Sequence, residues 1–367
     1  MRLSDFDITI YDQLADVAPL WRQLQENPSH YAFQSLEWLE CWQAAEPSPA
    51  APRIVVVCTA TGQPLLIMPL CIRLRYGLRQ LTFMAEEVSD YHAPLVAPDF
   101  AHHCPPGSFE PLFQAILARL PEVDYVSFRW MPEVIEGVAN PMAEITGCTH
   151  GLTAFQARLP AHFEAFLTRK RKKIHQDTNR QIKRLKELGP VVIERVTEPE
   201  EIATTVRTML DQKAQRFPRK SGPAEAAFRQ FAEKFYARIG AIRSPGSEGH
   251  VTRITCNGQI IATHIGILHG QRFYYIMPSF EAEGWGRYSP GRILMEHLIR
   301  ECIEQGVHTF DMTIGAEAYK RDWVDGDMKL FDVARGLSLK GKAFCAARAL
   351  ARHLRNRLRG AATTRSG

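Results

Sequence analysis

The chain has 367 residues, of which 45% are hydrophobic and 23% are charged, and its formal net charge is +5. These values are ordinary for a globular protein of about two domains, and they exclude a disordered or fibrous chain. No apolar run approaches the ~18–20 residues that a membrane span needs, and residues 1–13 lack the basic start and apolar core of a signal peptide.

The eight cysteines form no CxxC pair, and most lie in apolar patterns where a free thiol behaves as a small hydrophobic group. A reducing cytoplasm is therefore the expected location. The spacing of His92, His102, His103 and Cys104 fits no common zinc pattern. We expect neither a metal site nor a tightly bound cofactor.

The N-terminal half predicts the element order β-β-β-α-β. Strands are expected at residues 53–58, 65–72, 81–84 and 123–128, and the helix at 109–120. The loop after the third strand holds a compact polar trio: Asp90, Tyr91 and His92. Loop placement favours a role in substrate binding, although an Asx-type turn explains Asp90 equally well.

A long helix is predicted over residues 161–188, where Gly189 and Pro190 end it. Residues 169–186 hold nine basic residues and one acidic residue, Asp177. Such a helix suits RNA, a phosphorylated acceptor or a membrane surface, and the alternative is a solvated face. A second helix over 199–217 carries two candidate substrate-binding residues, Lys213 and Arg216.

The C-terminal half repeats the order β-β-β-α-β. Asn257-Gly258 is the favoured two-residue turn of a hairpin. The elements are predicted at residues 251–256, 259–268, 273–277, 290–305 and 307–314. Because 131–152 is rich in turn-forming residues, the domains are predicted at 1–155 and 156–335, followed by a basic tail at 336–367.

The tail carries most of the charge asymmetry. Nine of the 45 basic residues and none of the 40 acidic ones follow Asp332. Phe344, Leu350 and Leu354 alternate with arginines, a pattern that suits an amphipathic segment on anionic lipid. A frayed basic terminus explains the pattern equally well.

The start of the predicted helix 290–305 is a candidate anion site. Ser289 suits the N-cap, Pro290 suits the first position, and Gly306 can close the C-terminus. Unpaired N–H groups and the helix dipole favour negative charge there. The site can therefore receive a pyrophosphate-bearing acyl donor.

Several motifs in this order resemble a known family. They are Tyr288-Ser-Pro-Gly, Phe310-Asp, Tyr319-Lys, Phe33-Gln-Ser-Leu-Glu-Trp-Leu and Asp90-Tyr-His-Ala-Pro-Leu. Together they resemble the GNAT-like acyltransferases of the CelD-like/BioF2-like (cellulose-biosynthesis accessory) group, which are similar to Fem aminoacyl transferases. The resemblance implies an α/β (α+β) fold of tandem GNAT-like domains, with mixed, mostly antiparallel sheets flanked by helices.

The resemblance also implies site residues. The loop 284–291 corresponds to the segment that holds the pyrophosphate of coenzyme A, with Arg287, Ser289, Gly291 and Arg292 as candidate binding residues. Helix capping is the alternative for Arg287 and Ser289. Pro290 departs from that segment because it removes one amide donor. Lys320 matches the lysine of a Tyr-Lys motif that stabilises the reacting carbonyl or phosphate in Fem-like enzymes, and the alternative is a solvated lysine beside Arg321 and Asp322.

Other candidates follow from the chemistry of acyl transfer, which needs a proton acceptor for the amine and a stabilised oxyanion. Asp311 can orient or deprotonate the amine, and a structural aspartate is the alternative. Tyr275 and Tyr288 can protonate the leaving thiolate, although aromatic residues near strands more often only pack. Tyr319 is a candidate substrate contact, and His264 is expected to be a core residue.

These observations predict a cytoplasmic N-acyltransferase that uses acyl-CoA and an amine of a sugar, lipid or envelope precursor, with peripheral attachment to the inner membrane surface through the tail. One alternative is a Fem-like transferase that uses aminoacyl-tRNA, since this explains the basic helix and Pro290. Another is a non-catalytic accessory protein of polysaccharide biosynthesis.

Overall fold

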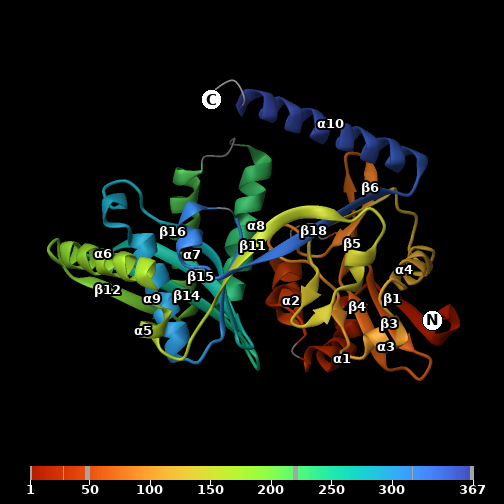
Figure 1. Ribbon diagram of the computed structural model, residues 1–367, viewed down its shortest axis with the longest axis horizontal. Coiled ribbons are helices and arrows are strands. Elements are labelled where there is room, and N and C mark those ends of the chain that lie inside the picture. The colour runs from red at the N-terminus through yellow and green to blue at the C-terminus, as the bar shows by residue number, and fades with distance from the viewer. Residues whose placement is uncertain (1, 28, 46–49, 218–221, 316, 364–367) are drawn as a thin grey trace. The chain divides into compact units, whose positions relative to one another are not determined.

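The computed structural model describes residues 2–27, 29–45, 50–217, 222–315 and 317–363, with side chains up to residue 351. The chain forms two compact units (Figure 1). Unit 1 comprises Met1–Leu36, Ser48–Leu152 and Lys329–Gly367, and unit 2 comprises Glu37–Pro47 and Thr153–Met328. The sequence-based division at residues 155 and 335 stays a proposal.

Unit 1 contains two sheets, with strand orders β1-β3-β4-β7 and β18-β8-β6-β5-β2. Buried aromatic side chains such as Trp21, Phe83 and Phe128 fill its core. Its elements are β1 (Phe6–Tyr11), α1 (Leu14–Gln25), β2 (Ala51–Pro52), β3 (Ile54–Thr59), β4 (Pro64–Met68), β5 (Leu70–Arg75), β6 (Leu78–Phe83), β7 (Leu95–Val96), α3 (Phe100–His103), α4 (Phe109–Leu117), β8 (Tyr125–Pro132), β9 (Val134–Ile135), β10 (Val138–Ala139), β18 (Gly326–Gly336) and α10 (Leu339–Thr363).

Unit 2 has the strand order β12-β14-β15-β16-β17-β11. Its elements are α2 (Leu36–Ala45), β11 (Thr149–Arg158), α5 (Phe163–Phe166), α6 (Arg169–Lys186), β12 (Val191–Val196), α7 (Pro199–Arg216), α8 (Pro223–Gly240), β13 (Arg243–Ser244), β14 (Ser247–Cys256), β15 (Gln259–His269), β16 (Arg272–Phe280), the 3₁₀ turn η4 (Gly286–Tyr288), α9 (Pro290–Glu304), β17 (Thr309–Ile314) and the 3₁₀ turn η5 (Ala318–Asp322).

The sheet of unit 2 has helices on both faces. Alternate residues of β15 point to opposite faces. Thr263 donates a hydrogen bond to Gln212 of α7, whereas Ala262 belongs to the cluster of buried residues that includes Ile293 and Leu294 of α9. The helix α9 thus packs on the face opposite to α7.

Two sequence predictions are wrong in detail. The strand expected at 65–72 is interrupted at Pro69, so β4 joins one sheet and β5 joins the other, since proline lacks the N–H that a continuous ladder needs. The helix expected at 161–188 is two helices, because Thr168 caps α6 by accepting a hydrogen bond from the Arg171 N–H.

The hairpin and the helix that lead to the site are confirmed. Asn257 and Gly258 have φ values of 50° and 76°, as a type I′ turn between β14 and β15 requires. The helix α9 starts at Pro290, and Gly306 follows its end with a φ of 73°.

Each unit contains one parallel strand pair linked by a helix, which is the core of the predicted repeat. In unit 1, β6 pairs with β8 and α4 lies between them in the chain. In unit 2, β16 pairs with β17 and α9 lies between them. The other strand pairings within each unit, among the described residues, are antiparallel.

Candidate active site

The strands β16 and β17 separate after a short parallel pairing. Arg272, Phe273 and Tyr274 pair with β17, the last of them with Asp311, and both strands then continue unpaired with each other. The β15 side of β16 is also irregular, because two β16 residues, Tyr275 and Ile276, lie opposite one β15 residue. Such a bulge breaks the ladder and releases backbone N–H groups. Released N–H groups at a strand fork can stabilise an oxyanion.

Gly266 is the β15 residue opposite this bulge. A Cβ atom there would lie 2.2 Å from the carbonyl oxygen of Tyr274 and 2.7 Å from Cε1 of His264. Both distances are shorter than real contacts, so the close approach of β15 to the bulge requires glycine.

Asp311 marks the fork and is fully buried. Its carboxylate lies 3.0 Å from the Arg272 guanidinium and accepts a hydrogen bond of 2.8 Å from the Thr313 N–H. Thr313 has a φ of 55°, a conformation that this bond helps to hold. The carboxylate therefore holds the two strands at their point of separation.

Lys320 is buried, with 4% of its surface exposed. Its Nζ donates to the carbonyl oxygens of Met312 and Ile314, at 2.8 and 2.6 Å, and lies 3.1 Å from the Glu317 carboxylate. These partners match the three donors of an ammonium group. In this state the lysine ties η5 to β17.

Tyr275 stacks on His264 from β15. Their ring centroids are 4.6 Å apart and the ring planes are 10° from parallel. Burial raises the pKa of the Tyr275 phenol well above its ordinary value, so the phenol stays protonated at neutral pH. As predicted, His264 is a core residue, and neither ring nitrogen has a hydrogen-bond partner among the described residues. Burial, followed by the charge of His250, lowers the pKa of His264 well below its usual range.

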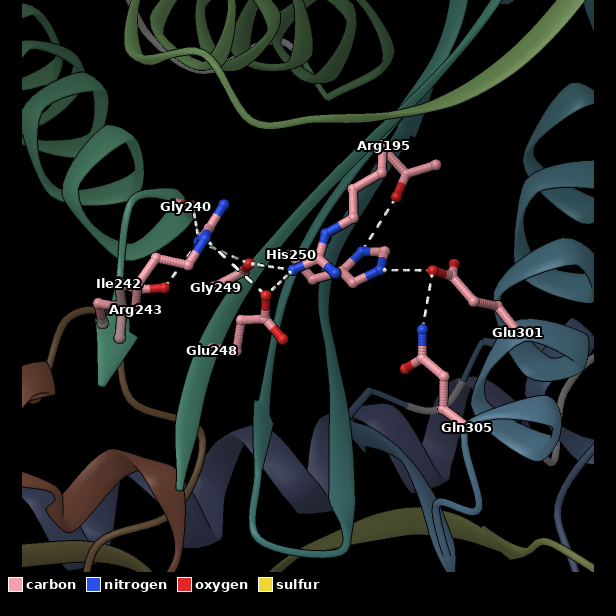
Figure 2. Close-up of polar contacts among 10 residues, drawn as sticks. Arg195, Gly240, Ile242, Arg243, Glu248, Gly249, His250, Glu301 and Gln305 are labelled. Atoms are coloured by element: carbon pink, nitrogen blue, oxygen red, sulfur yellow. Dashed lines mark hydrogen bonds and ion pairs between the residues drawn. The ribbon is translucent and has the colours of Figure 1, made fainter. Parts of the chain in front are cut away.

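A second buried histidine links α9 to the sheet (Figure 2). His250 Nε2 lies 3.3 Å from Glu301 of α9, and its Nδ1 lies 3.0 Å from the Thr252 hydroxyl. Gln305 donates to the same Glu301 oxygen at 3.2 Å. The hydrogen bond with His250 lowers the pKa of Glu301. This network fixes the orientation of α9, and no sequence motif indicated it.

The charge of Arg216 acts on two tyrosines of the candidate site, Tyr275 and Tyr319. The Arg216 guanidinium lies 4.0 Å from the ring centre of Phe280 and acts on the pKa of both tyrosines. Burial, with the Glu317 charge, raises the pKa of Tyr319 to about 12, against the opposing effect of Arg216.

Lys213 lies one turn earlier on α7, where its carbonyl oxygen accepts from the Phe217 N–H at 2.9 Å.

The N-terminus of α9 differs from the expected cap. Ser289 occupies the N-cap position with a φ of 52°, and its side chain makes no capping hydrogen bond. Ser289 is thus the N-cap residue, as predicted, but its hydroxyl does not cap the helix, since a capping side chain normally requires extended backbone. The N–H groups of Arg292 and Ile293 turn back to the Ser289 carbonyl oxygen, at 3.0 and 3.2 Å. Gly291 packs against Phe280, since a Cβ there would lie 3.0 Å from that ring.

Arginines of α6 and of the loop surround this helix start. Arg292 forms an ion pair with Asp177, which also accepts from Arg180 at 2.6 Å. Burial alone would raise the pKa of Asp177, but the two arginines lower it. Arg184 and Arg287 lie 5.4 and 4.9 Å from the ring centre of Tyr288, a buried residue. The basic helix thus lies against the predicted donor loop.

Arg171, on the same helix, is held by contacts within the protein. Its guanidinium donates to the carbonyl oxygens of Phe166 and Trp323 and to Asp325. It also lies 4.1 Å from the centre of the Phe166 ring. This basic residue therefore anchors α6 to the core.

The trio Asp90, Tyr91 and His92 belongs to unit 1, whereas the other candidates belong to unit 2. His92 stacks between Phe83 and Trp130, and its Nδ1 lies 2.9 Å from the Arg129 carbonyl oxygen.

Burial lowers the pKa of His92 to about 3. Tyr91 is fully buried, and Gln34 donates to its carbonyl oxygen at 3.0 Å. These contacts fill the region where β6 and β8 part, beyond the pair Leu81–Val126.

Residues 170–321 match the family model described as an acetyltransferase (GNAT) domain. This segment is therefore similar to GNAT-type acetyltransferase domains. The match confirms the predicted enzyme class and covers α6, β16, α9, β17 and the Tyr319-Lys320 pair. GNAT domains use an acyl-CoA as co-substrate. No curated protein matches the chain in sequence.

Solved structures share the fold at low sequence identity. FemX is 10% identical with a TM-score of 0.56, and the alignment covers 89% of this chain and 96% of that chain. The C-terminal domain of a putative lysylphosphatidylglycerol synthetase from Agrobacterium fabrum is 11% identical with a TM-score of 0.53, covering 92% and 97%. A tandem GNAT protein from the clavulanic acid biosynthesis pathway is 15% identical with a TM-score of 0.50, covering 91% and 99%. The predicted fold class is thereby confirmed.

Among the residues that the structure describes, no helix is both long enough and apolar enough to cross a membrane. No group of three or more His, Cys, Asp or Glu side chains within the described ranges is arranged to hold a metal ion.

Proposed function

We propose that unit 2 transfers an acyl group from acyl-CoA to an amine of a sugar, lipid or envelope precursor. The observation that carries the proposal is the fork of β16 and β17 beyond Tyr274 and Asp311, within the segment that matches the GNAT domain. The bulge at Tyr275 and Ile276 adds backbone N–H donors at the same place.

The donor pyrophosphate would bind at the start of α9. Pro290 has no N–H, and the N–H groups of Arg292 and Ile293 already have a partner, so Gly291 is the amide donor of the first turn. Arg287 and Arg184 supply positive charge beside it. Arg292 contributes through its ion pair with Asp177, and Ser289 lies at the N-cap.

In the proposed reaction the acceptor amine attacks the thioester carbonyl carbon, and the carbonyl oxygen becomes an oxyanion held by N–H groups of the bulge. The acceptor nitrogen then gives its extra proton to the Asp311 carboxylate, the carbon–sulfur bond breaks, and the leaving thiolate takes a proton from the Tyr275 phenol. Water carries the proton from Asp311 back to the Tyr275 phenolate, which restores both groups. Tyr288 is the second candidate for this acid. Asp311 would orient the amine, and Lys320 would act near the carbonyl group.

The acceptor would bind next to the fork. Arg216 and Tyr319 lie close enough to Tyr275 to influence its pKa, and Lys213 lies one turn before Arg216. Asp90, Tyr91 and His92 belong to unit 1, and a substrate-binding role for them stays a separate proposal.

An envelope acceptor is supported by three observations. The motifs resemble the CelD-like group, and the fold is shared with FemX and with a putative lysylphosphatidylglycerol synthetase domain. The basic tail, α10, would hold the protein at the inner membrane surface.

Transfer is tested by incubating the purified protein with acetyl-CoA or a long-chain acyl-CoA and with amino sugars or phosphatidylethanolamine. Release of free coenzyme A and a product mass increased by the acyl group are the expected results. No product with any donor, together with no binding of acyl-CoA, would contradict the proposal.

The second candidate is a transferase that uses aminoacyl-tRNA. It is favoured by Pro290 in the donor loop and by the basic helix α6 beside it. A tRNA gel shift that weakens with salt, combined with no binding of acyl-CoA, would favour this candidate. A non-catalytic accessory protein would instead keep its cellular function after Tyr275→Phe.

A further inference from the structure

The four most exposed large apolar side chains of the described residues gather on two elements of unit 1. Leu74 and Tyr76, at the tip of the β5–β6 hairpin, are 78% and 72% exposed. Leu339 and Leu350, on α10, are 87% and 60% exposed. Exposed apolar side chains that gather on one surface mark an interaction site, whereas single ones need no explanation.

The hairpin and the helix are held side by side (Figure 1). The ring of Phe344 in α10 lies 5.7 Å from that of Tyr76 and 5.0 Å from that of Tyr125. The start of the helix is anchored by Asp124, whose carboxylate accepts from the Ser338 hydroxyl at 2.6 Å. Phe344 itself is only partly covered, and Leu339 and Leu350 on the same helix stay exposed.

The two exposed leucines of α10 share one face of the helix. Leu339, Ala343, Ala346 and Leu350 follow at spacings of four, three and four residues, which places them in one row. Phe344 points to the other side, toward the hairpin. The helix thus has one face docked on unit 1 and one apolar face directed outward.

A basic residue lies beside each apolar group. Lys340, next to Leu339, is 67% exposed and lies 3.5 Å from the Asp124 carboxylate, and Arg75 lies 5.5 Å from the ring centre of Tyr76. The chain has no acidic residue after Asp332. Exposed leucines flanked by lysine and arginine complement a bilayer with anionic headgroups, because the leucines enter the acyl boundary while the cations meet the phosphates. A nucleic acid would contact the basic side chains but would leave the leucines exposed to water, so it fits this surface less well than a bilayer does.

We propose that the β5–β6 hairpin tip and the outward face of α10 form one surface that binds an anionic membrane. The proposal extends the proposed function, because it adds the β5–β6 hairpin tip to the tail as a second membrane contact. It does not depend on acyl transfer, since every residue of this surface belongs to unit 1.

The test is flotation of the full-length protein with phosphatidylcholine vesicles, with and without about 30% phosphatidylglycerol. The variant is Leu74→Ser with Tyr76→Asn, since asparagine tolerates the positive φ of 55° at that position. The matched control, Leu188→Ser with Val192→Ser, removes two apolar side chains that are 43% and 47% exposed in unit 2.

We expect the wild type and the control to bind only the anionic vesicles, and the hairpin variant to bind them about tenfold more weakly. Unchanged binding of the hairpin variant would overturn the proposal. Absence of vesicle binding would also overturn it, whether the protein shifts tRNA or forms a dimer instead. Binding of acyl-CoA, measured on the same samples, reports separately on the proposed function.

Discussion

Tyr274 and Asp311 are the last pair that joins β16 to β17, and Asp311 at the same time holds Arg272 and the Thr313 N–H. The fork is therefore stabilised by a fully buried carboxylate at its base. The residues directly beyond it, Tyr275 and Ile276, carry the bulge on the other side of the strand. This arrangement predicts which substitutions affect stability and which affect chemistry.

Asp311→Asn removes the anion that faces Arg272. Breaking one side of a buried ion pair leaves an uncompensated charge, so we expect the free energy of unfolding to fall by about 3–5 kcal/mol. Urea denaturation measures this change. Lys170→Met, which breaks the exposed pair with Asp322, should cost at most about 1 kcal/mol. Equal effects of the two variants would contradict the account.

Lys320→Met tests whether this lysine is structural in the free protein. Two carbonyl oxygens of β17 lose their donor, so we expect a loss of about 1–3 kcal/mol in the free energy of unfolding. The exposed neighbour, changed by Arg321→Met, is the control. A variant as stable as the wild type but inactive would show that the lysine acts only in catalysis.

Tyr275→Phe removes the proposed acid and keeps the stack on His264. We expect kcat to fall by about 10²-fold, with KM for acyl-CoA and the melting temperature nearly unchanged. Tyr288→Phe is the comparison, because this tyrosine lies beside Arg184 and Arg287 at the donor loop. A larger loss of kcat in Tyr288→Phe would assign the acid to Tyr288.

Because of His264, we expect the free energy of unfolding to decrease at acidic pH. Its folded-state pKa lies well below the ordinary value of about 6.5, so below that pH the unfolded chain takes up a proton that the folded state does not. The loss should begin near pH 6.5 and increase as the pH falls further.

His264→Phe should remove this part of the pH dependence, whereas His308→Phe, at an exposed position, should keep it. Thermal melts between pH 5 and 8 provide the measurement. A His264→Phe variant with the wild-type pH profile would be the contradicting result.

Local sequence signals were sufficient to predict the hairpin turn between β14 and β15 and the bounds of α9. Asn257-Gly258 specifies its turn by backbone conformation alone, and Pro290 with Gly306 delimits α9. Thr168 carried a helix-start signal directly before the basic run, but the prediction of one continuous helix missed it because Phe163, Phe166 and Leu167 before it also follow a helical spacing.

The parts that were not predicted depend on distant residues. The strand β18 pairs with β8 although about two hundred residues separate Trp130 from Asp332, which are joined by a hydrogen bond. The contact of His250 with Glu301 also joins residues that are distant in the sequence. Neither residue could be singled out beforehand, since each lies within an ordinary apolar pattern. The burial of Tyr91 and His92 likewise follows from packing that a polar loop motif does not reveal.

The central claim is that the start of α9 binds the phosphates of acyl-CoA, and isothermal titration of the full-length protein with coenzyme A, acetyl-CoA and a long-chain acyl-CoA tests it most directly. Ser289→Glu places a negative charge at this helix start and should weaken binding about tenfold. Ser108→Glu, at the N-cap of α4 in unit 1, is the matched control and should bind as the wild type does. We predict micromolar binding with this difference between the variants. No binding of any of the three ligands, or equal binding by both variants, would contradict the account.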